Sequence, residues 1–140
     1  MEKLKKVQLL APYLDERLVQ IEAWNQQNQV DLDHVVNGRR LTNLGCFREY
    51  LQRYLKHHPM IHSPEQMTFL VRQLQPSDKG IGIEIYVFSK DTRWVNYEAI
   101  QADIFDHLLA SVETFGLRLF QSPTDSSLER GLSKLFSGKA

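Results

Sequence analysis

The chain has 140 residues, and its 17 Lys and Arg residues balance 17 Asp and Glu residues, so the formal net charge is zero with neutral histidines. This balance argues against a general binder of nucleic acids or anionic membranes, because both classes need an excess of basic residues. A hydrophobic content of 42% and a lone cysteine predict one ordinary globular domain in a reducing compartment, without a disulfide framework.

The N-terminal segment, residues 1–28, has the apolar periodicity of a helix. The residues that recur at spacings of three and four are Val7, Leu10, Leu14, Leu18, Ile21 and Trp24. Pro12 has no amide hydrogen, so we expect a kink or a new helix start there. Residues 25–38 are polar and end in Asn37-Gly38, which is typical of a turn. Residues 1–38 are therefore expected to be a helix and a connector that lie outside the main domain.

The next segment combines a short strand with a helix. Residues 39–42 have the pattern of a strand, and Thr42 or Asn43 can cap a helix over residues 43–58. One face of this helix carries Leu44, Phe47, Leu51, Leu55 and His58. Pro59 is expected to end it.

Two strands and a second helix follow. Residues 67–75 have apolar side chains on both faces of a strand, whereas residues 80–89 alternate with a period of two. A turn sequence joins the two segments, which predicts an antiparallel pair. A long helix is expected over residues 93–115, where Ile100, Ile104, Leu108 and Val112 recur every four residues. Gly116 is well placed to stop it.

Residues 117–121 complete the pattern as a last short strand. The order strand, helix, strand, strand, helix, strand predicts an α+β fold over residues 39–121. It is a ferredoxin-like split βαβ sandwich with an antiparallel sheet and two helices on one face. Residues 122–140 are expected to be a flexible tail or a short amphipathic helix, which would carry Leu128, Leu132 and Leu135.

Motifs of catalysis and cofactor binding are missing from the sequence. It has no phosphate-binding loop, no nucleophile elbow and no zinc-protease motif. His57, His58 and His62 could chelate a metal, but no cysteine or carboxylate nearby completes the set, and histidines at a helix end also suit the helix dipole. Cys46 could be activated near the start of its helix, although a small buried side chain is the simpler interpretation. We therefore predict no enzyme activity, no metal and no cofactor.

An alternative is a domain of the RNA-recognition type that binds single-stranded nucleic acid. The segment Lys79-Gly80-Ile81-Gly82-Ile83 falls on the expected third strand, where that family has a basic-Gly-aromatic-Gly-aromatic signature. Isoleucines occupy both aromatic positions, and base stacking requires rings. The zero net charge also disfavours this alternative.

Charge is distributed unevenly along the chain, and this asymmetry supplies candidate interface residues. Residues 95–113 contain only acidic charges, among them Glu98, Asp103 and Asp106. Residues 39–58 are mainly basic, and the candidates there are Arg39, Arg40 and Arg48. The two sets could neutralise each other within one chain. Alternatively, the acidic helix of one subunit could meet the basic unit of the next, in a head-to-tail contact that closes a ring.

Several ordered blocks of sequence resemble the cytoplasmic part of small-conductance mechanosensitive (MscS-type) channels. They are Gly38-Arg39-Arg40-Leu41-Thr42-Asn43-Leu44-Gly45, Glu84-Ile85-Tyr86-Val87-Phe88, Asp91-Thr92-Arg93-Trp94 and Ile100-Gln101-Ala102-Asp103-Ile104-Phe105-Asp106-His107-Leu108. The resemblance covers roughly residues 7–124 and is strongest to the miniconductance (YbdG-like) branch.

The resemblance implies a homoheptameric channel of the bacterial inner membrane. Such channels open under membrane tension in hypo-osmotic shock, and their α/β domain forms a hollow cytoplasmic vestibule with side portals through which ions and small solutes pass. No run of this chain approaches the ~20 apolar residues of a membrane helix, and the pore-lining helix is missing. We therefore expect a soluble fragment from the cytoplasmic side, which acts in assembly and solute filtering.

Overall fold

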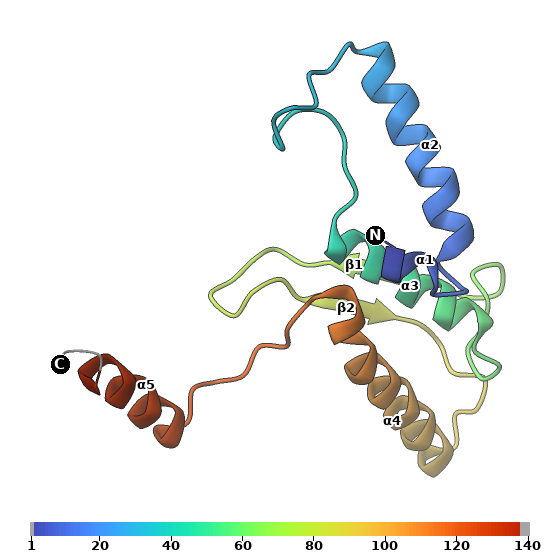
Figure 1. Ribbon diagram of the computed structural model, residues 1–140. Coiled ribbons are helices and arrows are strands. Elements are labelled where there is room, and N and C mark those ends of the chain that lie inside the picture. Colours follow the sequence, from blue (N-terminus) through green and yellow to red (C-terminus); the bar gives the residue numbers. More distant parts are fainter. Residues whose placement is uncertain (1, 138–140) are drawn as a thin grey trace.

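The structure is a computed structural model that describes residues 2–137, and helix α3 (Asn43–His57) lies in the middle of its body (Figure 1). The Thr42 side chain accepts a hydrogen bond from the Gly45 amide at 3.0 Å, which satisfies a donor of the first turn. The buried residues of α3 are Cys46, Phe47, Tyr50, Leu51 and Leu55. The predicted helix, its Thr42 cap and its end before Pro59 are confirmed.

Strands β1 (Leu70–Gln73) and β2 (Ile83–Tyr86) form an antiparallel pair in which Val71 lies opposite Ile85. The predicted pairing is confirmed, although each strand is shorter than expected. Among residues 2–137 the sheet has these two strands alone, so residues 39–42 and 117–121 do not form the expected first and fourth strands. The chain is thus an α+β domain, but the complete ferredoxin-like sheet is not present.

At the start of each missing strand, backbone groups of the first residue are bonded to groups outside a sheet. The Arg39 amide donates to Asn25 Oδ1 at 2.8 Å, and the Arg39 carbonyl accepts from Asn25 Nδ2 at 3.1 Å. At the other segment, the Leu117 amide donates to the Val112 carbonyl at 3.4 Å in the turn that follows Gly116. Groups used in this way are unavailable to a sheet ladder.

Helix α4 (Trp94–Ser111) continues into the 3₁₀ turn η1 (Val112–Phe115) and ends at Gly116, which has a φ of 67°. The Phe115 ring lies 5.2 Å from that of Phe47 and 5.3 Å from that of Tyr50, measured between centroids. These contacts fix the end of α4 against α3. The predicted helix over residues 93–115 and its glycine stop are confirmed, with the last turn in 3₁₀ form.

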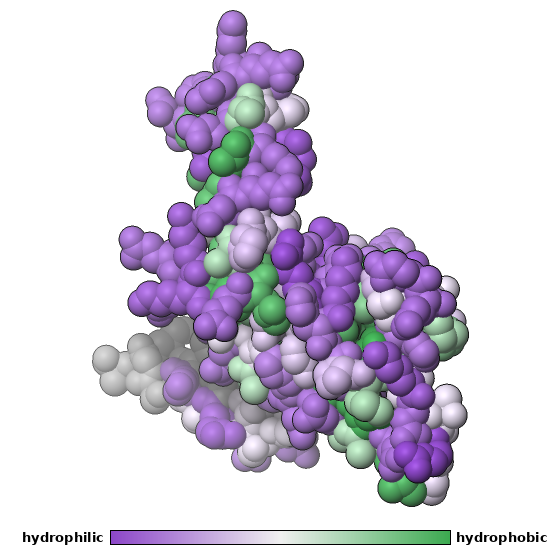
Figure 2. All heavy atoms as spheres, turned by 90° about the vertical axis from the view of Figure 1, so that its right-hand side faces the viewer, coloured by the Kyte–Doolittle hydropathy of each residue, from purple (hydrophilic) through white to green (hydrophobic). Residues whose placement is uncertain are grey.

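The N-terminal part consists of α1 (Glu2–Lys5) and α2 (Ala11–Gln27), so the break expected near Pro12 is present. Leu4, Leu10 and Leu14 are buried in the same hydrophobic core as α3. The expectation that this whole segment lies outside the domain is therefore wrong for its beginning. The rest of α2 projects from the body, and hydrophilic residues cover most of the projecting part on the face seen in Figure 2.

The C-terminal part is an extended segment followed by helix α5 (Asp125–Ser137), which stands away from the body in Figure 1. This confirms the helical alternative for the tail. The side chain of Leu135 and residues 138–140 lie outside the described part of the chain. No helix within residues 2–137 has the length and apolar character needed to cross a membrane.

Candidate subunit interface

The acidic candidates lie on one exposed side of α4. Glu98, Asp103 and Asp106 are all exposed. With a rotation of about 100° per residue, the three positions fall within an arc of about 140° around the helix axis. Asp103 has one ionic neighbour, His58, whose Nε2 lies 3.7 Å from Asp103 Oδ2. Within residues 2–137, Glu98 and Asp106 form no ion pair.

The basic candidates lie in two places. Arg39 and Arg40 belong to the connector beside α2, whereas Arg48 is on α3 and donates from Nη1 to Gln73 Oε1 of β1 at 3.1 Å. The Arg40 guanidinium donates to the Leu32 carbonyl at 3.0 Å and to the carbonyl of His34 at 3.4 Å. The Arg39 guanidinium lies 5.8 Å from the ring centroid of Trp24. All these partners are uncharged, and none of the three arginines forms an ion pair within residues 2–137.

The structure does not bring the acidic and basic candidates together within one chain. The ion pairs of the described residues are Arg53–Glu49, His58–Asp103, Arg72–Glu84 and Arg93–Asp91. None of them joins one of the three candidate arginines to a candidate carboxylate. Within residues 2–137, the candidate acidic and basic residues therefore do not neutralise each other through direct ion pairs.

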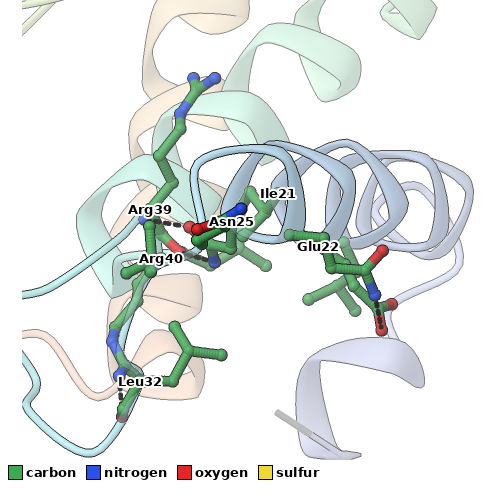
Figure 3. Close-up of a pocket in the computed structure, with 11 residues that line it drawn as sticks. Ile21, Glu22, Asn25, Leu32, Arg39 and Arg40 are labelled. Carbon is green, nitrogen blue, oxygen red and sulfur yellow. Dashed lines mark hydrogen bonds between the residues drawn. The ribbon is translucent and has the colours of Figure 1, made fainter.

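Asn25 holds the connector against α2, and sequence reasoning missed it. Its side chain is 7% exposed and makes both hydrogen bonds to the Arg39 backbone, which are drawn in Figure 3. Gly38 precedes Arg39 with a φ of 69°, and a Cβ there would lie 2.7 Å from Asn25 Oδ1. The sequence Asn37-Gly38 predicted a turn at this glycine. A polar residue on the apolar face of α2 was the available signal for Asn25.

An open groove of about 750 Å³ lies between α2 and the connector (Figure 3). Its walls combine apolar side chains with polar ones, and it includes Ile21, Glu22, Leu32 and both candidate arginines of the connector. Asn25 and Arg39, which are joined by two hydrogen bonds, both line this groove. The position of Arg39 and Arg40 therefore depends on how the connector is held on α2.

A second polar cluster joins α3 to α4. Tyr50 Oη and His107 Nε2 lie 2.6 Å apart, and the Tyr54 ring stacks on His107 with centroids 4.1 Å apart. His58 contacts the edge of Tyr54 and approaches Asp103. Burial, with the Asp103 carboxylate nearby, raises the pKa of Tyr54. This cluster fixes the orientation of the acidic helix relative to α3.

The N-terminal end of α4 is fixed by Asp91. Its carboxylate accepts hydrogen bonds from the Arg93 guanidinium and from the side chain of Asn96 at 2.7 Å. The Arg93 guanidinium, followed by the Asn96 amide and the Arg93 backbone amide, holds the pKa of Asp91 well below its usual range. These donors favour the charged carboxylate and so stabilise the turn that begins α4.

The other titratable groups considered from sequence have local roles. His57 Nδ1 lies 2.7 Å from the Arg53 carbonyl, and His62 Nδ1 lies 3.2 Å from Gln66 Oε1. Within residues 2–137, no three His, Cys, Asp or Glu residues are grouped so as to hold a metal ion. Cys46 is 1% exposed, and burial raises the pKa of its thiol, as expected for a small core residue.

Comparison with known proteins places this body in a family. A family described as "Mechanosensitive ion channel MscS, C-terminal" matches residues 41–119, which include α3, both strands, α4 and η1. The low conductance mechanosensitive channel YnaI of Escherichia coli K12 is 32% identical over 73 residues, which are 52% of this chain and 21% of that protein. The chain thus spans about a fifth of this relative's length, and the YbdG-like branch stays a prediction.

No solved structure gives a significant match. The family match nevertheless covers more than half of the chain and includes the acidic helix together with Arg48. It begins two residues after Arg39 and ends before α5. From this match, the chain belongs to the MscS family of mechanosensitive ion channels and contains the family's C-terminal domain.

Proposed function

We propose that this chain forms part of the wall of a cytoplasmic vestibule beneath a tension-gated pore. The family match over residues 41–119 is the observation that carries this proposal, because it covers the whole body built from α3, β1, β2 and α4. The pore itself requires membrane-spanning segments, which other parts of the natural channel would supply. The vestibule would lie on the cytoplasmic side of a bacterial inner membrane.

The role proposed for the domain is mechanical and does not involve catalysis. Copies of the domain would assemble as a homoheptamer, and openings between them would filter the ions and small solutes that leave the cell in hypo-osmotic shock. The α3–α4 packing through Phe115 and the Tyr50–His107 bond supports a rigid wall. A rigid wall keeps such openings at a constant size.

The proposed contact between subunits pairs the acidic side of α4 with the basic residues of the next copy. Glu98 and Asp106 form no ion pair within residues 2–137, and the contacts of Arg40 and Arg48 are with uncharged groups. Unpaired charges of opposite sign on different elements of one chain are complementary between two copies. A head-to-tail contact of this kind closes a ring when its rotation fits.

Charge reversal tests this contact in the natural, membrane-extracted channel. Asp106→Lys alone, and Asp103→Lys with Asp106→Lys, are expected to shift the assembled ring toward smaller species in native mass spectrometry. Adding Arg40→Glu and Arg48→Glu to the double variant should restore the ring. An unchanged heptamer in the double variant would show that this interface is wrongly assigned.

The matched control is Asp15→Lys with Asp78→Lys. Both residues are exposed carboxylates that form no ion pair within residues 2–137, and neither belongs to α3, to α4 or to the connector that carries Arg39 and Arg40. This control makes the same change in net charge and should leave the assembly intact. Survival of cells after dilution into low-salt medium, in a strain that depends on this channel, measures function in parallel.

A further inference from the structure

An open apolar groove of about 430 Å³ runs along the body on the side from which the C-terminal segment leaves. Its lining includes Ile81, Phe105, Leu109 and Leu119, each about half exposed. These side chains come from the segment before β2, from α4 and from the stretch after η1. Apolar side chains gathered in this way on a soluble surface mark a place where another element binds.

Helix α5 carries a second exposed apolar surface. Leu128 and Leu132 lie one turn apart on it and are 53% and 54% exposed. An isolated helix of 13 residues is only marginally stable in water, so α5 needs a partner for its leucine row. The acidic residues Asp125 and Glu129 are close to this row by helical position, whereas Arg130 is on the opposite side.

We propose that α5 of one copy binds in the apolar groove of a second copy. Residues 117–119 line the groove and residues 120–124 lead away from it to α5 (Figure 1). For α5 to enter its own groove, the chain would have to reverse direction within residues 120–124, which include Pro123. Binding to a second copy needs no such reversal.

Charge supports α5 as the element that binds in the groove. Arg118 lines the groove and forms no ion pair within residues 2–137. The acidic flank of α5, made of Asp125 and Glu129, would then approach this arginine when the leucine row faces the groove. One groove and one α5 per chain allow two copies to exchange α5 reciprocally or several copies to bind head to tail, and neither arrangement depends on the charge pairing proposed above for α4.

Disulfide trapping in the complete 140-residue chain tests the exchange. Leu132→Cys and Leu109→Cys are made in separate chains, mixed and oxidised, and then separated by non-reducing electrophoresis. A mixed dimer should form that neither variant gives alone. The control pairs Leu109→Cys with Arg130→Cys, on the opposite side of α5, and should give little dimer. The parent chain controls for Cys46, which is buried.

Mass measurement by light scattering gives a second readout. The measured mass of the parent chain is expected to be a multiple of 16.3 kDa. The double substitution Leu128→Asp, Leu132→Asp should lower the measured mass to that of a single chain. Glu129→Lys should weaken association, and Arg118→Glu in the same chain should restore it.

Three results would overturn the exchange. One is a chain carrying Leu109→Cys and Leu132→Cys that links only within itself. Another is a disulfide that forms only between Leu132→Cys of two copies and not between Leu132→Cys and Leu109→Cys. The third is a parent chain that is monomeric in light scattering, together with cysteine variants that form no mixed dimer. Because the test uses this chain alone, its failure would leave the proposed role in a channel intact.

Discussion

Replacing Asn25 by Ala should detach the connector from α2 and destabilise the domain. The side chain is 7% exposed and makes two hydrogen bonds with the Arg39 backbone, at 2.8 and 3.1 Å. Each such bond contributes about 1 kcal/mol net, and an unsatisfied partner adds to the loss where water cannot reach it. We therefore expect the free energy of unfolding to fall by about 2 kcal/mol, which is roughly a 30-fold change in the folding equilibrium.

Urea unfolding followed by circular dichroism measures this loss, and limited proteolysis of residues 28–38 reports on the connector itself. Asn28→Ala is the matched control, because Asn28 is exposed and makes one bond, to the Trp24 carbonyl at 2.8 Å. Its effect should stay within about 0.5 kcal/mol. If Asn25→Ala is no more destabilising than this control and cleavage does not accelerate, the anchoring role of Asn25 is refuted.

Three further substitutions test separate features. Gly38→Ala should lower the free energy of unfolding in urea by about 1–3 kcal/mol, because its φ is 69° and its Cβ would lie 2.7 Å from Asn25 Oδ1; a stability equal to that of the parent would contradict this close contact. Tyr50→Phe removes the part-buried hydrogen bond between α3 and α4 and should lower the free energy of unfolding by about 1 kcal/mol. A variant as stable as the parent would show that this bond does not stabilise the fold. The pKa of Asp91 is lower in the folded state than in the unfolded chain. The stabilisation that its carboxylate gives to the fold is therefore complete above the usual pKa range of a carboxyl group and is lost as the pH falls through and below that range. Melting temperatures from about pH 6 to pH 2 should fall less steeply in Asp91→Asn than in the parent, and parallel curves would contradict the assignment.

The elements that the sequence predicts well are those set by local signals. Helix α3 follows from a Thr42 cap, an apolar face and a proline just after its end, all within one stretch of chain. The β1–β2 pair follows from alternation and an intervening turn. Residues 39–42 have equally good strand character, but Asn25 competes for the Arg39 backbone from 14 positions away. The position of Asn25 on the apolar face of α2 indicates a buried polar contact, but no local pattern reveals that its partner is Arg39.

The same distinction applies to the candidate interface. The exposure of Glu98, Asp103 and Asp106 could be predicted, because helical periodicity places them away from Ile104 and Leu108, which are buried. The contacts that fix α4 could not be predicted, since Tyr50 and His107 are 57 positions apart. Their meeting depends on how two helices pack, which a single sequence does not specify.

The most direct test of the central claim is electrical recording from membrane patches that contain the natural channel. Suction applied to the patch should evoke a conductance that rises with membrane tension and disappears when the gene is deleted. The Asp103→Lys, Asp106→Lys variant should reduce it, and the Asp15→Lys, Asp78→Lys control should not. Membranes that contain the protein and show no tension-dependent current would contradict the assignment to a mechanosensitive vestibule.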